Sequence, residues 1–248
     1  MIQKNKSLSE KIILITGAAN GLGRSIALEC GKAGASLILC DKELRNLEIV
    51  REELESCSNK NILLVPINFE GATIGDYEAL VSAAKDRYGK LDCMIFNAAT
   101  LGELAPLEHY DPMVWAKVFQ VNLHSIFLML KFCGPILEKN TNCDIIFTLA
   151  PEIRSIKPFW GAYAVSKKAL LGLMELTTKE MASHSLVKVI GIVPSAMRTN
   201  LYRQAYPAGN YSVIDEPEKN VATYINILNG SFNYKSGDVI ELGKKVKI

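Results

Sequence analysis

The sequence predicts an α/β fold in which helices cover both faces of one doubly wound, parallel sheet of about seven strands. Short apolar runs alternate along the 248 residues with longer stretches whose apolar residues recur at helical spacing. The first run is followed directly by a glycine-rich turn and a helix, as in a βαβ unit. No linker-like segment or internal repeat divides the chain, so we expect a single domain over residues 1–248.

Strands and helices are expected to alternate through most of the chain. We expect strands at 11–16, 35–40, 62–67, 93–97, 143–150, 187–193 and 238–242. We expect helices between them at 22–32, 43–57, 75–88, 111–138 and 162–183. The segment 199–217 is the most irregular, because it contains two prolines and a glycine, and a last helix is expected after it.

Composition excludes several classes of protein. Apolar residues make up 49% of the chain and charged residues 22%, which favours an ordinary folded core over disorder. With 28 Lys and Arg against 26 Asp and Glu, the net charge of +2 does not favour a nucleic-acid partner. The polar N-terminus lacks a secretory signal, and no apolar run approaches the roughly 18 residues of a membrane span. We expect a cytoplasmic protein without a membrane partner.

Cysteine and histidine form no pattern of a metal site. The six cysteines contain no CxxC pair, and several lie inside predicted strands. His109, His124 and His184 are scattered and lack ligand spacing. We expect reduced thiols in the core, which fits a cytoplasmic protein, and no bound metal.

The glycine-rich turn predicts a nucleotide site. Gly17, Gly21 and Gly23 stand between the first strand and its helix. Glycine lets the backbone approach a pyrophosphate closely, and the helix N-terminus offers N–H groups and partial positive charge to the anion. The alternative is a structural turn without a ligand. The strand–turn–helix context favours the nucleotide site.

Asp41 ends the second strand and predicts which dinucleotide is bound. A carboxylate at this place hydrogen-bonds a ribose diol and repels a 2′-phosphate. Asn20 stands in the glycine turn where a basic residue would favour that phosphate, although Lys42 offers a weak counter-charge. We therefore expect NAD rather than NADP. The alternative is that Asp41 only opens the helix at 43–57.

Five segments resemble, in order, motifs of the short-chain dehydrogenase/reductase family. They are TGAANGLG (16–23), FNAAT (96–100), VNL (121–123), YAVSK (163–167) and PSAMRT (194–199). Ala99 and Ser195 replace glycines of the family pattern. Within the family, WGAYAVSK and the run from Met197 to Pro207 are most similar to the bacterial YciK-type, oxoacyl-reductase-like branch.

The resemblance implies a Rossmann-like domain and an NAD(P)-dependent oxidoreductase that interconverts a carbonyl and a secondary alcohol. It implies that Tyr163 is the acid/base, that Lys167 supports it and that Asn122 supports a proton-relay water. It implies cofactor contacts from Gly17, Asn20, Gly21, Leu22, Gly23, Asp41, Asn68, Asn97, Tyr163, Lys167 and Thr199. Two of these have structural alternatives, since Asn97 could cap a turn and Thr199 could cap a helix.

Tyr163 and Lys167 also have a chemistry that the residues themselves suggest. At i and i+4 they share one face of a helix. A phenol with a pKa near 10 is a poor base at neutral pH, but a nearby ammonium would lower that pKa. The tuned phenol could then exchange a proton with an alcohol. On spacing alone such a pair is usually a solvated helix face, and the other motifs favour the catalytic interpretation.

One departure from the family concerns catalysis directly. Ala150 stands where the family has a catalytic serine, and alanine cannot donate a hydrogen bond to a carbonyl. Thr148 is expected to point to the same side of the strand, and Ser155 lies on the following loop, but neither is a convincing substitute. The departure leaves an alternative open, a catalytically impaired NAD-binding scaffold or sensor.

Two further features bear on partners. The loop after residue 150 carries Glu152, Arg154 and Lys157, which could contact a polar or acidic substrate or point to water. Trp160 could wall the substrate pocket. The helices at 111–138 and 162–183 have more apolar residues than one sheet face can cover. We expect a small-molecule substrate and a homodimer or homotetramer formed through these two helices.

Overall fold

The computed structural model describes residues 7–57, 59, 61–137, 143–182 and 187–243. Seven strands form one sheet in the order β3-β2-β1-β4-β5-β6-β7, and every neighbouring pair is parallel. The strands are β1 Ile12–Thr16, β2 Ser36–Asp41, β3 Ile62–Pro66, β4 Cys93–Phe96, β5 Cys143–Thr148, β6 Val187–Val193 and β7 Val239–Glu241. The predicted fold class is confirmed.

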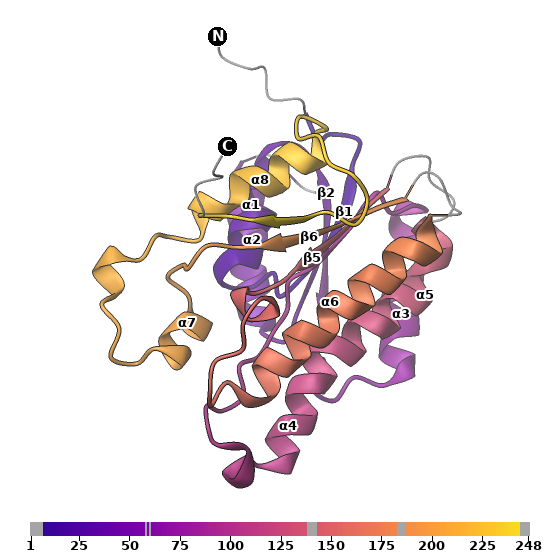
Figure 1. Cartoon of the computed structure of the whole chain (residues 1–248). Coiled ribbons are helices and arrows are strands. Elements are labelled where there is room, and N and C mark those ends of the chain that lie inside the picture. The colour runs from indigo at the N-terminus through magenta and orange to yellow at the C-terminus, as the bar shows by residue number, and fades with distance from the viewer. Residues whose placement is uncertain (1–6, 58, 60, 138–142, 183–186, 244–248) are drawn as a thin grey trace.

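Helices cover both faces of the sheet (Figure 1). One face carries α1 Gly21–Lys32, α2 Leu44–Ser56 and α8 Glu218–Leu228. The other carries α3 Ile74–Tyr88, α5 Ser125–Leu137 and α6 Gly161–Met181, and α4 Pro112–Phe119 packs against α6. The short helix α7, Asn200–Ala205, stands beyond the sheet (Figure 1). Each face has its own apolar core, so the central strands are buried on both sides and read as continuous apolar runs.

The strand order places the functional region. From β1 the chain proceeds outward through β2 and β3, then returns to place β4 on the other side of β1. The loops that leave β1 and β4 therefore diverge, and a crevice opens between them at the carboxyl edge of the sheet. The glycine turn follows β1, and Asn97 follows β4.

The structure differs from the expected elements in three places. The strand expected at 143–150 ends at Thr148, and Ala150 precedes a short 3₁₀ turn, Pro151–Ile153 (η3). The helix expected at 111–138 is divided by a π-helical turn, Gln120–His124 (η2). The irregular segment contains α7. Residues 138 and 183, where two helices were expected to end, lie outside the described residues.

The expectation that no apolar run matches a membrane span is wrong on length and composition. Pro112–Leu137 is a continuous helical run that is long and apolar enough to span a membrane, and it contains only two charged side chains. In this fold the run packs with α3 and α6 against the sheet, and 33% of its most apolar window is buried. Its remaining apolar surface bears on oligomerisation, discussed below.

Candidate functional site

One cavity of about 700 Å³ follows the carboxyl edge of the sheet, a size typical of small-molecule sites. Its walls come from the segments after β1 to β6 and from α6 and α7. The predicted site residues that line it are Gly17, Asn20, Gly21, Leu22, Asp41, Asn68, Asn97, Tyr163, Lys167 and Thr199. Gly23 and Asn122 are not among the lining residues.

Close packing explains the glycines of the turn. Gly17 has a φ of +68°, and a Cβ there would lie 2.9 Å from the Cα of Ala98. A Cβ on Gly23 would overlap the Gly17 carbonyl oxygen. The turn thus brings bare backbone and the N-terminal N–H groups of α1 to the cavity. These groups fit the pyrophosphate of a dinucleotide.

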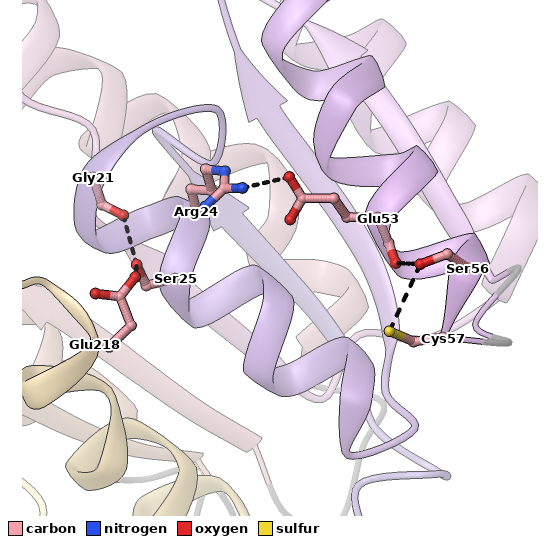
Figure 2. Close-up of polar contacts among 7 residues, drawn as sticks. All are labelled: Gly21, Arg24, Ser25, Glu53, Ser56, Cys57 and Glu218. Carbon is pink, nitrogen blue, oxygen red and sulfur yellow. Dashed lines mark hydrogen bonds and ion pairs between the residues drawn. The ribbon is translucent and has the colours of Figure 1, made fainter.

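Side chains from two other helices hold α1 in place (Figure 2). The guanidinium of Arg24 pairs with Glu53 of α2. The hydroxyl of Ser25 lies 2.8 Å from the carboxylate of Glu218 in α8 and 3.1 Å from the Gly21 carbonyl oxygen, and its single proton is shared between these two acceptors. The first turn of α1, which faces the cavity, is thereby fixed between α2 and α8.

Asp41 joins the glycine turn to the start of α2. Its carboxylate accepts hydrogen bonds from the backbone N–H of Ala19 at 3.0 Å and of Glu43 at 3.1 Å. The neighbouring ammonium of Lys42 pairs with Glu70 at 3.2 Å. Asp41 therefore does stabilise the start of the helix, as the structural alternative proposed. Because its side chain also lines the cavity, it remains suited to a ribose contact.

Two amides lie at the same end of the cavity. The side-chain oxygen of Asn20 accepts a 3.4 Å hydrogen bond from the amide of Asn46 in α2. That of Asn68 accepts a 3.1 Å bond from the backbone N–H of Glu70. Both residues line the cavity, where β3 and the glycine turn meet. Together with Asp41 they form a polar end that fits an adenosine.

Asn97 ties the ends of β4 and β1 together. Its amide donates to the carbonyl oxygens of Thr16 at 3.2 Å and Gly17 at 3.3 Å. The hydroxyl oxygen of Thr16 in turn accepts from the backbone N–H of Asn97 at 3.0 Å and of Ala98 at 3.1 Å. Thr16 was not predicted as a site residue from the sequence. Its signal was a single hydroxyl at the end of an apolar strand, directly before the glycine turn.

Tyr163 and Lys167 come together at the other end of the cavity. They are 6% and 3% exposed, and the Lys167 ammonium lies 5.9 Å from the Tyr163 ring centroid. The ammonium donates a 2.9 Å hydrogen bond to the carbonyl oxygen of Thr148 at the end of β5. The pair therefore lies beside the carboxyl edge of the sheet, along which the cavity runs.

Burial dominates the titration of this pair. It raises the pKa of Tyr163, and the nearby carboxylate of Glu152 raises it further. Burial lowers the pKa of Lys167 to about 8, although Glu152 acts in the opposite direction. The expected lowering of the Tyr163 pKa by Lys167 is not found in the protein alone, where burial is the largest cause of the shift and raises this pKa.

Asn122 is fully buried behind the cavity, in the π-helical turn η2. Its amide accepts from the backbone N–H of Thr100 at 2.8 Å and donates to the carbonyl of Thr100 and the hydroxyl of Ser166, both at 3.0 Å. The Ser166 hydroxyl donates to the carbonyl of Tyr163 at 2.8 Å. Asn122 thus connects the loop after β4 to the first turns of α6.

Neither the hydroxyl of Thr148 nor that of Ser155 takes the place of the missing serine. Ala150 lies in the cavity wall, packed in the apolar cluster that contains Tyr163. The expectation that Thr148 points to the same side is wrong, because its hydroxyl lies 3.1 Å from that of Tyr224 in α8, on the opposite face. The alternation of the strand does not extend past its end. Ser155 is exposed and does not line the cavity.

The charged loop after Ala150 divides between the cavity and the surface. Glu152, in η3, is 6% exposed and lines the cavity. Arg154 is exposed and pairs with Glu241 at 2.7 Å. Lys157 is exposed and donates to the hydroxyl of Tyr206 at 3.4 Å. Of the three, only the acidic side chain faces the site.

Aromatic side chains close the cavity over Tyr163. The ring of Trp160 lies 5.9 Å from that of Tyr163 and 5.8 Å from that of Tyr206, which follows α7. Tyr202 stacks obliquely on Tyr206 at 4.8 Å. Thr199 caps α7 by accepting from the backbone N–H of Tyr202 at 3.1 Å, so its structural alternative is also realised. Tyr202 in α7 and Tyr206 directly after it were not predicted as site residues from the sequence.

Comparison with known proteins adds a family and three relatives. A family model described as short chain dehydrogenase matches residues 11–209. The oxidoreductase YciK of Escherichia coli (strain K12) is 27% identical over 94% of this chain and 92% of its own length. Its solved structure superposes with a TM-score of 0.92 over 97% of this chain and 98% of that chain.

Two other solved chains were complexed with a nicotinamide cofactor. A short chain dehydrogenase structure from Escherichia coli CFT073, complexed with NADPH, is 27% identical and covers 97% of this chain and 100% of its own, with a TM-score of 0.92. One from Shigella flexneri, complexed with NADP, is 26% identical and covers 96% of this chain and 99% of its own, with a TM-score of 0.91.

Proposed function

The chain belongs to the short chain dehydrogenase family, in its YciK-type branch, and we propose that Tyr163 exchanges the proton in its reaction. The protein is an NAD(P)-dependent oxidoreductase that interconverts a carbonyl and a secondary alcohol, so an inert scaffold is not favoured. One observation carries the residue assignment: Tyr163 and Lys167 are buried together in the cavity that begins at the glycine turn. The test is to follow nicotinamide absorbance with a panel of ketones and secondary alcohols at saturating cofactor.

The two ends of the cavity have different parts in the proposed reaction. A bound nicotinamide supplies or accepts the hydride. The glycine turn and Asp41 bind the rest of the dinucleotide, and the aromatic cluster around Trp160 excludes water from the reacting end. Tyr163 gives its phenolic proton to the forming alkoxide in reduction and takes it back in oxidation. Lys167 stabilises the phenolate through its charge, and Asn122 keeps α6 in register with the loop after β4.

We propose NAD(H) as the preferred cofactor, although two relatives were solved with NADP(H). Asp41 places a negative charge at the adenosine end of the cavity, and the charge of Lys42 is shared with Glu70. A 2′-phosphate would meet the carboxylate. We expect NADH to bind about tenfold or more tightly than NADPH in a fluorescence titration. Asp41→Asn should reduce the difference between the Kd values of NADH and NADPH. Glu78 is an exposed carboxylate of α3, and Glu78→Gln should leave that difference unchanged. Tighter binding of NADPH by the unaltered protein would refute the preference.

Helices α4, α5 and α6 leave an apolar surface uncovered, which we propose is a homo-oligomer interface. Phe127 of α5 and Leu176 of α6 are each 51% exposed, and Met113 of α4 is 66% exposed. α4 leads through η2 into α5 as one helical run, and α6 packs against this run (Figure 1). Covering such a patch is a common reason for association.

Phe127→Glu should reduce the mass in solution to that of the monomer, because an unpaired charge in the interface is strongly unfavourable. Light scattering after gel filtration measures this mass. Leu107→Glu is the control, since Leu107 is 73% exposed in the short turn before α4. A monomeric unaltered protein would exclude the interface.

We also propose that the chain is one domain that acts on a small molecule in the cytoplasm. One sheet carries all seven strands, and one cavity spans its carboxyl edge. All six cysteines are free thiols, and five of them are buried, which is typical of a reducing compartment.

A further inference from the structure

The reacting end of the cavity holds a carboxylate for which the reaction described above has no use. Glu152 follows the missing serine position by two residues, is 6% exposed and lines the cavity. Among the described residues, no hydrogen bond or ion pair joins its carboxylate to another group. It lines the same cavity as Tyr163 and Lys167 and acts electrostatically on both of them. Its oxygens are not among the fully buried atoms without a partner, so the carboxylate opens to the cavity, where a ligand can meet it.

The cations nearby do not supply a partner for the carboxylate. Arg154 is paired with Glu241 outside the cavity, and Lys157 is held by Tyr206 on the outer side. The ammonium of Lys167 is directed to the carbonyl oxygen of Thr148. Of the other charged side chains lining the cavity, all belong to its adenosine end: Asp41, Lys42, Glu43 and Glu70. Among the described residues that line the cavity, Glu152 is therefore the carboxylate that a ligand at the reacting end can meet.

The walls next to Glu152 suit a cation as well. Trp160, Tyr202 and Tyr206 form an aromatic cluster over this end of the cavity. The ammonium of Lys157 lies 5.8 Å from the ring centroid of Trp160 and 5.9 Å from that of Tyr206, so these rings already attract a cation. Aromatic faces beside a carboxylate are a common way to bind an ammonium group.

We propose that the substrate is an amino alcohol or amino ketone and that Glu152 determines this specificity by pairing with the substrate ammonium. The inference rests on the proposed function of Tyr163 and Lys167. In the oxidative direction the carbinol carbon loses hydride to the cofactor, the hydroxyl proton passes to the Tyr163 oxygen, and a ketone remains. The ammonium group is unchanged and stays paired with Glu152 throughout.

Three secondary alcohols of matched size test the charge preference at pH 7. They are 1-amino-2-propanol, the neutral 2-butanol and the anionic lactate. We expect kcat/KM to fall about 10- to 100-fold from the first to the second, as for the loss of a charged hydrogen bond, and to be lowest for lactate. Glu152→Gln should remove the preference, so that kcat/KM of the amine approaches that of 2-butanol measured on the same variant; the ratio of the two cancels any change that loss of the carboxylate causes in Tyr163 and Lys167. The exposed control Glu78→Gln should retain it.

The outcomes separate this inference from the proposed function. Equal oxidation of the amine and 2-butanol, or a preference that survives Glu152→Gln, overturns the role of Glu152 and leaves the oxidoreductase intact. If none of the three alcohols is oxidised, each is titrated into the complex of the protein with NADH and followed by nicotinamide fluorescence. Tighter binding of the amine supports the inference, and equal or weaker binding of the amine overturns it. This arm compares ligands on the unaltered protein, so it does not depend on the folding of a variant.

Discussion

Tyr163→Phe is expected to lower kcat by about 10²- to 10⁴-fold and to leave the Kd of NADH nearly unchanged. The substitution removes the phenolic proton but keeps the ring, which packs 5.9 Å from Trp160 in the cavity wall. The dinucleotide end, formed by the glycine turn and Asp41, is not altered. Turnover is measured by nicotinamide absorbance, and cofactor binding by fluorescence titration.

A second buried phenol provides the control for this prediction. Tyr224 of α8 is fully buried, and burial raises its pKa as it does that of Tyr163. Its hydroxyl meets Thr148 on the opposite face of β5 and does not line the cavity. Tyr224→Phe should therefore keep kcat within a few-fold, with some loss of stability of about 1 kcal/mol for the hydrogen bond. Equal activity of Tyr163→Phe and the unaltered protein would exclude Tyr163 as the proton donor.

The parts of the fold that were predictable depend on local patterns. Each of the seven strands carries a run of apolar residues that no helix would bury on all sides, and each was placed within about two residues. The glycine turn was predictable because Gly17 and Gly23 meet a steric requirement that no other residue satisfies. Tyr163 and Lys167 share a helix face through the helical repeat alone.

What the sequence could not indicate depends on contacts between distant segments. Thr148 and Ala150 were expected on the same side because the strand was predicted to continue to residue 150, whereas β5 ends at Thr148 and Ala150 packs with Tyr163. Glu152, Arg154 and Lys157 are similar in polarity and nearly adjacent in the chain. Only the packing of α7 and the position of Glu241 decide which of them faces the cavity.

Ala150→Ser should raise kcat by up to about 10²-fold, since loss of one donor to a developing oxyanion typically costs about 10²- to 10³-fold. Ala150 is 3% exposed in the cavity wall, in the same cluster as Tyr163. Its backbone is extended, with a φ of −147° and a ψ of 158°, so serine is accommodated without strain. The added hydroxyl would face the reacting end and could donate to the substrate oxygen beside Tyr163.

The comparison with Ala150→Gly isolates the hydroxyl from a change in volume. Glycine removes a methyl group from the wall and adds no donor, so kcat should not rise in that variant. If Ala150→Ser also leaves kcat unchanged, the substrate oxygen is already held by another group, and the missing serine is not the limit on turnover. Where Ala150→Ser does raise kcat, the double variant with Glu152→Gln distinguishes the two contacts. The serine should act on kcat through the oxyanion, whereas Glu152 should act on KM through the ammonium.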